Sequence, residues 1–329
     1  MRLKVRLKVR RVNMVSSFYR QVAKIASPGG NRGKLQIFIF HRVLDKPDPL
    51  SPGEPDTLQF EKIISMVSNI FNVIPLGEAI EKLATGNLPG RAACITFDDG
   101  YIDNYTNAFP ILKKYKAPAT IFIATDFIGG EMMWNDIVIE SIRKINEPII
   151  IEELGLVDSG NINDEYRIST IQKIIGEIKH LPPLKRAEFV SLIQEKTGFE
   201  KFSLMMNEEQ LLGLHNEEIT LGAHTRSHPI LKSLNDLEAR KEIGESKEIL
   251  EALLKDTVSL FAYPNGRPGE DYTARDVDIV SSIGFKAAVS TEKRVANRTS
   301  SIYEVPRFTP WDTNIDKFML RSLLENYRA

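Results

Sequence analysis

Short, mostly apolar runs alternate with stretches of helical spacing along most of this 329-residue chain. Runs 36–40 and 93–97 lack the apolar–polar alternation of a half-exposed strand, and they are therefore typical of parallel strands buried on both faces. Further strand-like runs lie at residues 72–76, 119–124, 218–223, 258–263, 286–290 and 302–308. Helical spacing is found at residues 60–71, 77–83, 105–116, 235–254, 277–283 and 316–327. Strands that alternate with helices predict an α/β fold with a mostly parallel sheet, closer to an incomplete barrel than to an open doubly wound sheet.

Residues 131–206 interrupt this rhythm. The segment has helical stretches, loops near residues 155–160 and 182–183, and no strand as strong as those around it. In barrels of alternating strands and helices, the loops at the active-site end are the ones that carry long insertions. We therefore expect a barrel over residues 35–329, with residues 131–206 as a helical insertion on one βα loop.

The first 34 residues differ from the rest of the chain in charge. They hold ten Lys and Arg residues and no Asp or Glu, whereas the remaining residues hold 33 basic and 44 acidic side chains. Period-two spacing over residues 2–10 gives way to helical spacing from Met14 onwards. Two interpretations of this basic arm (residues 1–34) stay open. It is either a helix that packs before the first barrel strand behind a frayed tail, or a basic amphipathic element that contacts an anionic membrane surface.

Composition argues against several classes of protein. The single cysteine, Cys94, lies in an apolar run and cannot form a disulfide within the chain. No apolar run reaches the ~18 residues of a transmembrane helix, and the N-terminus lacks the apolar region of a secretory signal. We therefore expect a cytoplasmic protein, or one peripheral to the inner face of the membrane. Aromatic residues are not interleaved with the basic ones, so we expect no nucleic acid partner.

Polar groups stand directly after three of the predicted strands. They are His41, the adjacent pair Asp98 and Asp99, and the two histidines of a His-x-x-x-His motif, His224 and His228. The carboxyl ends of parallel strands converge at one mouth, and the histidine spacing corresponds to one helical turn. Two imidazoles with the Asp99 carboxylate would form a three-ligand metal site with open positions, leaving Asp98 as a general base toward water. Each motif alone also fits a solvated turn.

These motifs resemble those of the polysaccharide deacetylases, the NodB-homology carbohydrate esterases. Residues 96–100 (Thr-Phe-Asp-Asp-Gly) match the first motif of that family, and residues 224–228 (His-Thr-Arg-Ser-His) match the second. Residues 261–266 (Phe-Ala-Tyr-Pro-Asn-Gly) look like a variant of the third. The resemblance covers the chain from the first predicted barrel strand to the last, without the insertion.

The resemblance implies a distorted (β/α)7 barrel that binds a divalent metal, usually zinc, and hydrolyses acetyl groups from amino sugars. It also implies that Asp98 is the catalytic base and that Asp99, His224 and His228 bind the metal. The third motif departs from the family, because Ala262 stands where an arginine usually orients the base. We expect Arg307, on the last predicted strand, to reach the base from another direction.

The proton donor is also out of its usual place. The C-terminal Leu-x-His motif of the family is missing, because no histidine follows His228. Residues 40–43 (Phe-His-Arg-Val) instead precede the first motif, as in a circularly permuted branch that resembles exopolysaccharide N-deacetylases. The strands before the first and after the last are neighbours in a closed barrel, so His41 is expected to act as the general acid. The alternative is a buried histidine bonded to a backbone carbonyl.

Candidate substrate contacts are Tyr263, Asn265 and Trp134. Asn265 replaces the aromatic residue of the third motif, where the resemblance implies a backbone N–H that stabilises the oxyanion. Trp134 and Trp311 flank the predicted mouth, where they would stack on sugar rings or simply pack. We expect a zinc-dependent hydrolase that removes the N-acetyl group from an amino sugar in a polysaccharide or glycan precursor. An O-acetyl esterase and a catalytically inert glycan-binding barrel are the alternatives.

Overall fold

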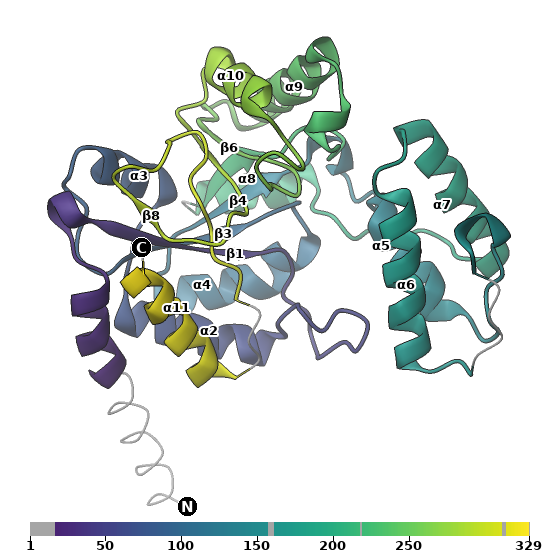
Figure 1. The fold of residues 1–329 in the computed structure, drawn as a ribbon, viewed down its shortest axis with the longest axis horizontal. Coiled ribbons are helices and arrows are strands. Elements are labelled where there is room, and N and C mark those ends of the chain that lie inside the picture. Colours follow the sequence, from purple (N-terminus) through teal and green to yellow (C-terminus); the bar gives the residue numbers. More distant parts are fainter. Residues whose placement is uncertain (1–16, 157–160, 218, 311–313, 329) are drawn as a thin grey trace, which may run out of the picture.

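A curved, mostly parallel β-sheet forms the centre of this computed structural model, which describes residues 17–156, 161–217, 219–310 and 314–328 (Figure 1). The strands follow one another in the order β7-β6-β5-β4-β3-β1-β8, and β2 pairs with the start of β3. Their bounds are β1 (Lys34–Phe40), β2 (Asn72–Val73), β3 (Ala92–Phe97), β4 (Ala119–Ile123), β5 (Thr220–Ala223), β6 (Leu260–Ala262), β7 (Ala287–Val289) and β8 (Ala296–Asn297). The α-helices are α2 (Thr57–Ile70), α3 (Leu76–Ala84), α4 (Phe109–Tyr115), α5 (Trp134–Lys144), α6 (Asp164–Ile178), α7 (Pro183–Thr197), α8 (Glu208–Asn216), α9 (Asp236–Leu254), α10 (Ala274–Ile283) and α11 (Ile315–Arg328).

A short segment near the C-terminus links the two ends of the parallel sheet. Val305 bridges Val289 of β7, and Phe308 bridges Phe38 of β1, both in parallel orientation. The prediction of a regular strand over residues 302–308 is therefore wrong. It forms two separate bridges, because the proline between them has no N–H to donate to a continuous ladder. With this segment the parallel strands form a distorted (β/α)7 barrel, and the predicted fold class is confirmed.

Alternate residues of the central strands pack into two different apolar layers. β1 pairs with β3 from Leu35 opposite Ala92 to Phe40 opposite Phe97. Leu35 lies in a cluster with residues of β6, β7 and α3, whereas Phe40 packs in a larger cluster under α2, α9 and α10. Burial on both faces explains why these strands show no polar alternation in the sequence.

The helical insertion stands beside the barrel as a separate group of helices (Figure 1). Helices α5, α6 and α7 lie within the predicted segment 131–206, and no regular strand occurs among its described residues. They pack around an apolar cluster of their own, which includes Ile137, Ile174 and Ile193. The insertion follows β4 in the chain and returns to the barrel through α8, so it extends a βα loop.

A helix over residues 17–26 precedes β1. Its Ala23 is fully buried in the larger barrel cluster. Residues 1–16, which hold six of the ten basic side chains of the arm, lie outside the described residues. Membrane contact of the basic arm therefore stays a prediction. Within the part of the chain that the structure describes, no helix combines the length and apolar character needed to cross a membrane.

Gly222 on β5 provides a test of the barrel packing. A Cβ atom at this position would lie 2.5 Å from Cδ1 of Phe122 and 3.0 Å from the carbonyl oxygen of Leu260. We therefore expect Gly222→Ala to lower the free energy of unfolding by roughly 1–3 kcal/mol. Gly176 of α6 has no atom within 4 Å of its Cβ position, and Gly176→Ala should raise stability by up to about 1 kcal/mol. Urea unfolding measures both, and equal stability of the two variants would contradict this packing.

Candidate active site

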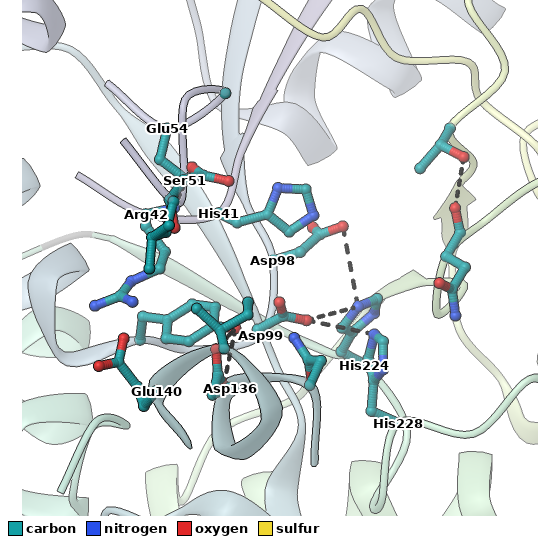
Figure 2. Close-up of a pocket in the computed structure, with 17 residues that line it drawn as sticks. His41, Arg42, Ser51, Glu54, Asp98, Asp99, Asp136, Glu140, His224 and His228 are labelled. Carbon is teal, nitrogen blue, oxygen red and sulfur yellow. Dashed lines mark hydrogen bonds and ion pairs between the residues drawn. The ribbon is translucent and has the colours of Figure 1, made fainter. Parts of the chain in front are cut away.

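Three side chains from the ends of β3 and β5 form a close cluster, here named the triad (Figure 2). Asp99 follows β3, and His224 and His228 follow β5. Oδ1 of Asp99 lies 3.4 Å from Nε2 of each histidine. One ligand atom from each of the three residues lies within 4.8 Å of the others. The structure thus brings together the three residues predicted as metal ligands.

The chemistry of the triad fits a divalent metal ion. Oδ1 of Asp99 is buried and accepts no hydrogen bond from the described residues. Burial alone would raise the pKa of Asp99, but His228 and His224 hold it below its ordinary value. Nδ1 of His224 lies 2.7 Å from the carbonyl oxygen of Ala262, so the ring donates there and Nε2 keeps its lone pair for a ligand. Burial lowers the pKa of His228 to about 4, which keeps that imidazole neutral as metal binding requires.

His224 and His228 do not lie on a helix, in contrast to the argument from their spacing. They flank a loop in which Thr225 and His228 have positive φ angles of 63° and 54°. Glu242 of α9 holds this loop, because its Oε2 accepts the backbone N–H of Ser227 at 2.9 Å. The spacing therefore identified the right pair of histidines, but left-handed backbone rather than helical pitch brings them together.

A buried arginine holds Asp98 by both carboxylate oxygens. Nη1 and Nη2 of Arg307 each donate to one oxygen at 2.7 Å, and both residues are almost wholly inaccessible to solvent. Nε of Arg307 donates to the carbonyl of Ser290, and Nη1 also lies 3.3 Å from Oγ1 of Thr96. Burial alone would raise the pKa of Asp98, but Arg307 and then His224 hold it below its ordinary value. Asp98 is therefore ionised and fixed in orientation, while its catalytic role stays a prediction.

His41 lies beside Asp98 in the same cavity (Figure 2). Burial lowers the pKa of His41, but the carboxylates of Asp99, Glu54 and Asp98 outweigh burial and raise the pKa above its ordinary value. Among the described residues, the ring forms no hydrogen bond to a backbone carbonyl, which was the structural alternative. The position of His41 therefore suits a proton donor.

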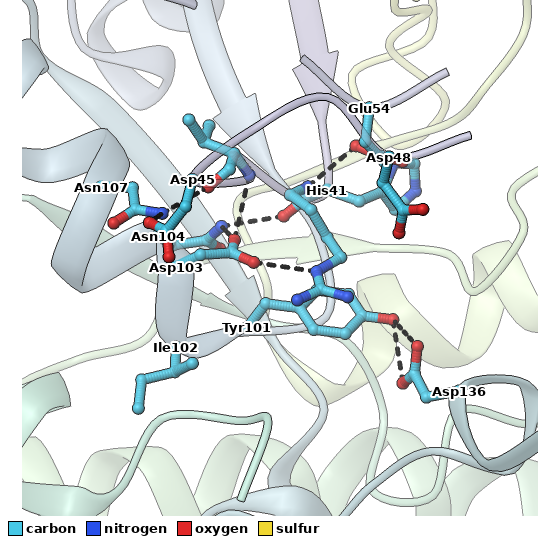
Figure 3. Close-up of polar contacts among 12 residues, drawn as sticks. His41, Asp45, Asp48, Glu54, Tyr101, Ile102, Asp103, Asn104, Asn107 and Asp136 are labelled. Carbon is cyan, nitrogen blue, oxygen red and sulfur yellow. Dashed lines mark hydrogen bonds and ion pairs between the residues drawn. The ribbon is translucent and has the colours of Figure 1, made fainter. Parts of the chain in front are cut away.

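A polar network that the sequence analysis missed holds the loop after β1 (Figure 3). Nε of Arg42 donates to Oδ2 of Asp103 at 2.8 Å, and Oδ1 of Asp103 accepts the backbone N–H that follows Arg42. Asn104, at the start of the π-helical turn η2 (Asn104–Ala108), donates to the carbonyl of His41 at 2.8 Å. These contacts fix the backbone that carries the imidazole. In the sequence, the signal for this network was the cluster of polar residues directly after the Asp-Asp-Gly motif.

The insertion reaches the site through Asp136 of α5. The hydroxyl of Tyr101 lies 3.1 Å from each carboxylate oxygen of Asp136, and the Arg42 guanidinium lies 4.8 Å from the centre of the Tyr101 ring. Burial raises the pKa of Asp136 to about 7. A cavity of about 360 Å³, here named the mouth cavity, is lined by His41, Glu54, Asp98, Asp99, Tyr101, Asp136, Glu140, His224, His228 and Asn265, among others. Both the barrel and the insertion therefore shape the site.

One of the predicted substrate contacts lines the mouth cavity, and another lines the cavity beside it. Asn265 lines the mouth cavity and has a positive φ of 58°. Trp134, the first residue of α5, lines a neighbouring cavity on the insertion side, where the Arg186 guanidinium lies 5.0 Å from its ring centre. Packing on Arg186 therefore occupies part of the Trp134 ring. Trp311 lies outside the described residues.

The prediction that Tyr263 contacts substrate is not supported by its position. Its side chain is fully buried, and its ring stacks on Tyr272 with the ring centres 3.8 Å apart. Its hydroxyl donates to the carbonyl of Tyr303 at 3.0 Å. Tyr263 therefore packs beneath the site and supports the loop that carries Asn265.

Comparison with known proteins identifies the family. A sequence profile described as polysaccharide deacetylase matches residues 85–155 and 185–288, together more than half of the chain. The chain belongs to the polysaccharide deacetylase family. The matched regions contain Asp98 and the triad but neither His41 nor Arg307, the two groups that lie outside the usual order of motifs.

Individual members of the polysaccharide deacetylase family agree with this assignment. The poly-beta-1,6-N-acetyl-D-glucosamine N-deacetylase of Staphylococcus aureus (strain MSSA476) is 24% identical over 264 residues, which cover 80% of this chain and 70% of that protein. The Streptococcus pyogenes deacetylase PplD, solved in complex with acetate, is 18% identical with a TM-score of 0.60 over 89% of this chain and 99% of that one. IcaB from Ammonifex degensii is 18% identical with a TM-score of 0.58 over 90% and 98%. At this identity the two structures show the shared barrel fold.

The geometry of the triad predicts that it binds a metal ion. Asp99→Ala should lower the affinity for Zn²⁺ by more than about 100-fold, because loss of an outer partner of a ligand alone costs 10- to 100-fold. Calorimetric titration of metal-free protein with Zn²⁺ measures this change. His180→Ala is the control, because His180 is an exposed histidine of the insertion outside the triad. This variant should bind Zn²⁺ as tightly as the wild type does. Unchanged affinity of the Asp99 variant would rule out the triad as the metal site.

Proposed function

We propose that this protein is a metal-dependent N-deacetylase that hydrolyses the N-acetyl group of an amino sugar in a polysaccharide or glycan precursor, with zinc as the expected metal. The observation that carries this proposal is the placement of a buried, ionised Asp98 directly beside a carboxylate–imidazole–imidazole triad. A fixed base next to three metal ligands, in a cavity open to solvent, is the arrangement that metal-assisted hydrolysis needs.

Each of the residues at the mouth has a separate role in the proposed reaction. Asp99, His224 and His228 would hold a divalent metal ion, which would supply a Lewis acid toward water and the acetyl carbonyl. Asp98 takes the proton of the attacking water, and Arg307 keeps Asp98 ionised and in place. The backbone N–H of Asn265 donates to the carbonyl oxygen as negative charge develops on it. His41 gives a proton to the nitrogen that leaves as an amine.

Two observations favour an N-acetyl group over an O-acetyl group. An amine is a poor leaving group without a proton, so amide hydrolysis depends on an acid such as His41 more than ester hydrolysis does. In addition, the Staphylococcus aureus relative is named for N-deacetylation of poly-beta-1,6-N-acetyl-D-glucosamine, at 24% identity. Both support a glycan with N-acetylated amino sugars as the substrate class.

Replacing the base tests the mechanism. Asp98→Asn should lower acetate release from an N-acetylated oligosaccharide about 10²- to 10⁴-fold, because an amide cannot accept the proton. Bound zinc, measured on the same sample, should be unchanged, and assays below the unfolding temperature separate this effect from lost stability. Asp278→Asn on the exposed side of α10 is the control. More than a tenth of wild-type turnover in the Asp98 variant at full metal content would reject the mechanism.

Replacing the acid tests the choice of leaving group. His41→Ala should lower hydrolysis of an N-acetylated sugar at least about 100-fold and that of the matching O-acetylated sugar by clearly less. Acetate release from the two substrates measures the difference. Equal losses would contradict the acid role of His41. A wild-type protein that prefers the ester would be an O-acetyl esterase, and a zinc-loaded protein that hydrolyses neither would be a glycan-binding barrel.

A further inference from the structure

We propose that a second cavity, between the insertion and the barrel mouth, binds an anionic group of the substrate through Lys179 and Arg186. The proposal rests on the proposed function, because it specifies what the deacetylated glycan carries. The anionic group is a phosphate ester or a carboxylate on a sugar next to the acetylated one.

This side cavity adjoins the mouth cavity. It has a volume of about 170 Å³ and shares Asp99, Asn135, His228 and Asn265 with the mouth cavity. Its other walls come from α5, the end of α6 and the start of α7. A glycan whose acetamido group lies at the triad therefore extends its neighbouring unit into the side cavity.

The two cations of the side cavity lack carboxylate partners. Arg186 is half-buried, stacks on the ring of Trp134 and donates from Nη1 to the carbonyl of Lys179 at 3.3 Å. Among the described residues, neither Arg186 nor Lys179 forms an ion pair with a carboxylate, and burial without a counter-charge lowers the pKa of Arg186. By contrast, Arg143 on the same insertion is bound by both Asp48 and Glu140. An unneutralised guanidinium on a partly desolvated surface is a strong recognition element for phosphate or carboxylate.

Acidic side chains are concentrated on one side of the triad. Of the described residues that line the side cavity, Asp99 is the sole acidic one, and it belongs to the triad. The mouth cavity on the other side is lined by Glu54, Asp136 and Glu140, and its one lysine or arginine, Arg42, is paired with Asp103. An uncharged chain of N-acetylated sugars has no group that complements the cations of the side cavity. A glycan with an anionic substituent on one side of the acetylated sugar complements them directly.

The proposal is tested with three N-acetylated oligosaccharides that differ in one neighbouring sugar: uncharged, a uronic acid, or a phosphate monoester. The zinc-loaded wild-type protein should hydrolyse at least one anionic substrate with a KM roughly tenfold or more below that of the uncharged one, the size expected for a charge-assisted contact. Arg186→Gln and Lys179→Gln should each remove most of this difference, and each should change the KM of the uncharged substrate by clearly less. Lys185→Gln, at an exposed position of α7 outside the cavity, is the matched control and should keep the full difference.

The outcomes separate this proposal from the proposed function. A wild-type KM that is equal for all three substrates, or an Arg186 variant that affects charged and uncharged substrates alike, would overturn the side cavity as an anion site. The relative KM of the uronic acid and phosphate substrates identifies which anion it takes. If no substrate releases acetate, the proposed function fails. Calorimetric titration with the same oligosaccharides then tests the anion site by itself. Anionic oligosaccharides should still bind tighter to the wild type than to the Arg186 and Lys179 variants, and equal affinities would refute the anion site.

Discussion

The contact between Arg307 and Asp98 connects the closure of the barrel with the chemistry of its mouth. Two adjacent carboxylates at the end of a buried strand repel each other, so each needs a counter-charge of its own. Asp98 has the buried guanidinium, whereas the counter-charge of Asp99 would come from a metal ion held between its carboxylate and the two imidazoles of the triad. Removing one partner of a buried ion pair typically costs about 3–5 kcal/mol. The same segment that delivers Arg307 also bridges β7 to β1, so the fold and the site share this support.

Four residues in and around the mouth have a backbone conformation that residues other than glycine rarely adopt. Asp99, Thr225, His228 and Asn265 all have positive φ, although none is a glycine. Each such residue costs on the order of 1–3 kcal/mol and persists only where its surroundings hold it. Here the surroundings include the Glu242 carboxylate under the histidine loop. The side chains predicted to bind the metal are therefore held in place by a strained backbone that the surrounding structure supports.

Local pattern was enough to predict most of the parallel strands and the polar groups that follow them, because burial on both faces and polar groups at strand exits leave direct traces in the sequence. It was not enough for features that depend on distant contacts. The histidine loop was expected to be helical, since spacing alone cannot show the positive φ of Thr225. Tyr263 was assigned to the substrate because the sequence does not show which face of a strand exit is covered, here by Tyr272. Asp136 and Arg186 were missed because the packing of the insertion, which no local pattern encodes, brings them to the mouth.

The order of the site residues along the chain has a consequence for synthesis. Of these residues His41 is synthesised first, and the guanidinium that supports Asp98 is synthesised last. Until then the Asp98 carboxylate lacks this counter-charge, and no segment bridges β7 to β1. A nascent chain that ends before Arg307 therefore lacks both the closure of the barrel and the group that fixes Asp98 in orientation. The site is complete only after the segment that carries Arg307 has joined the sheet.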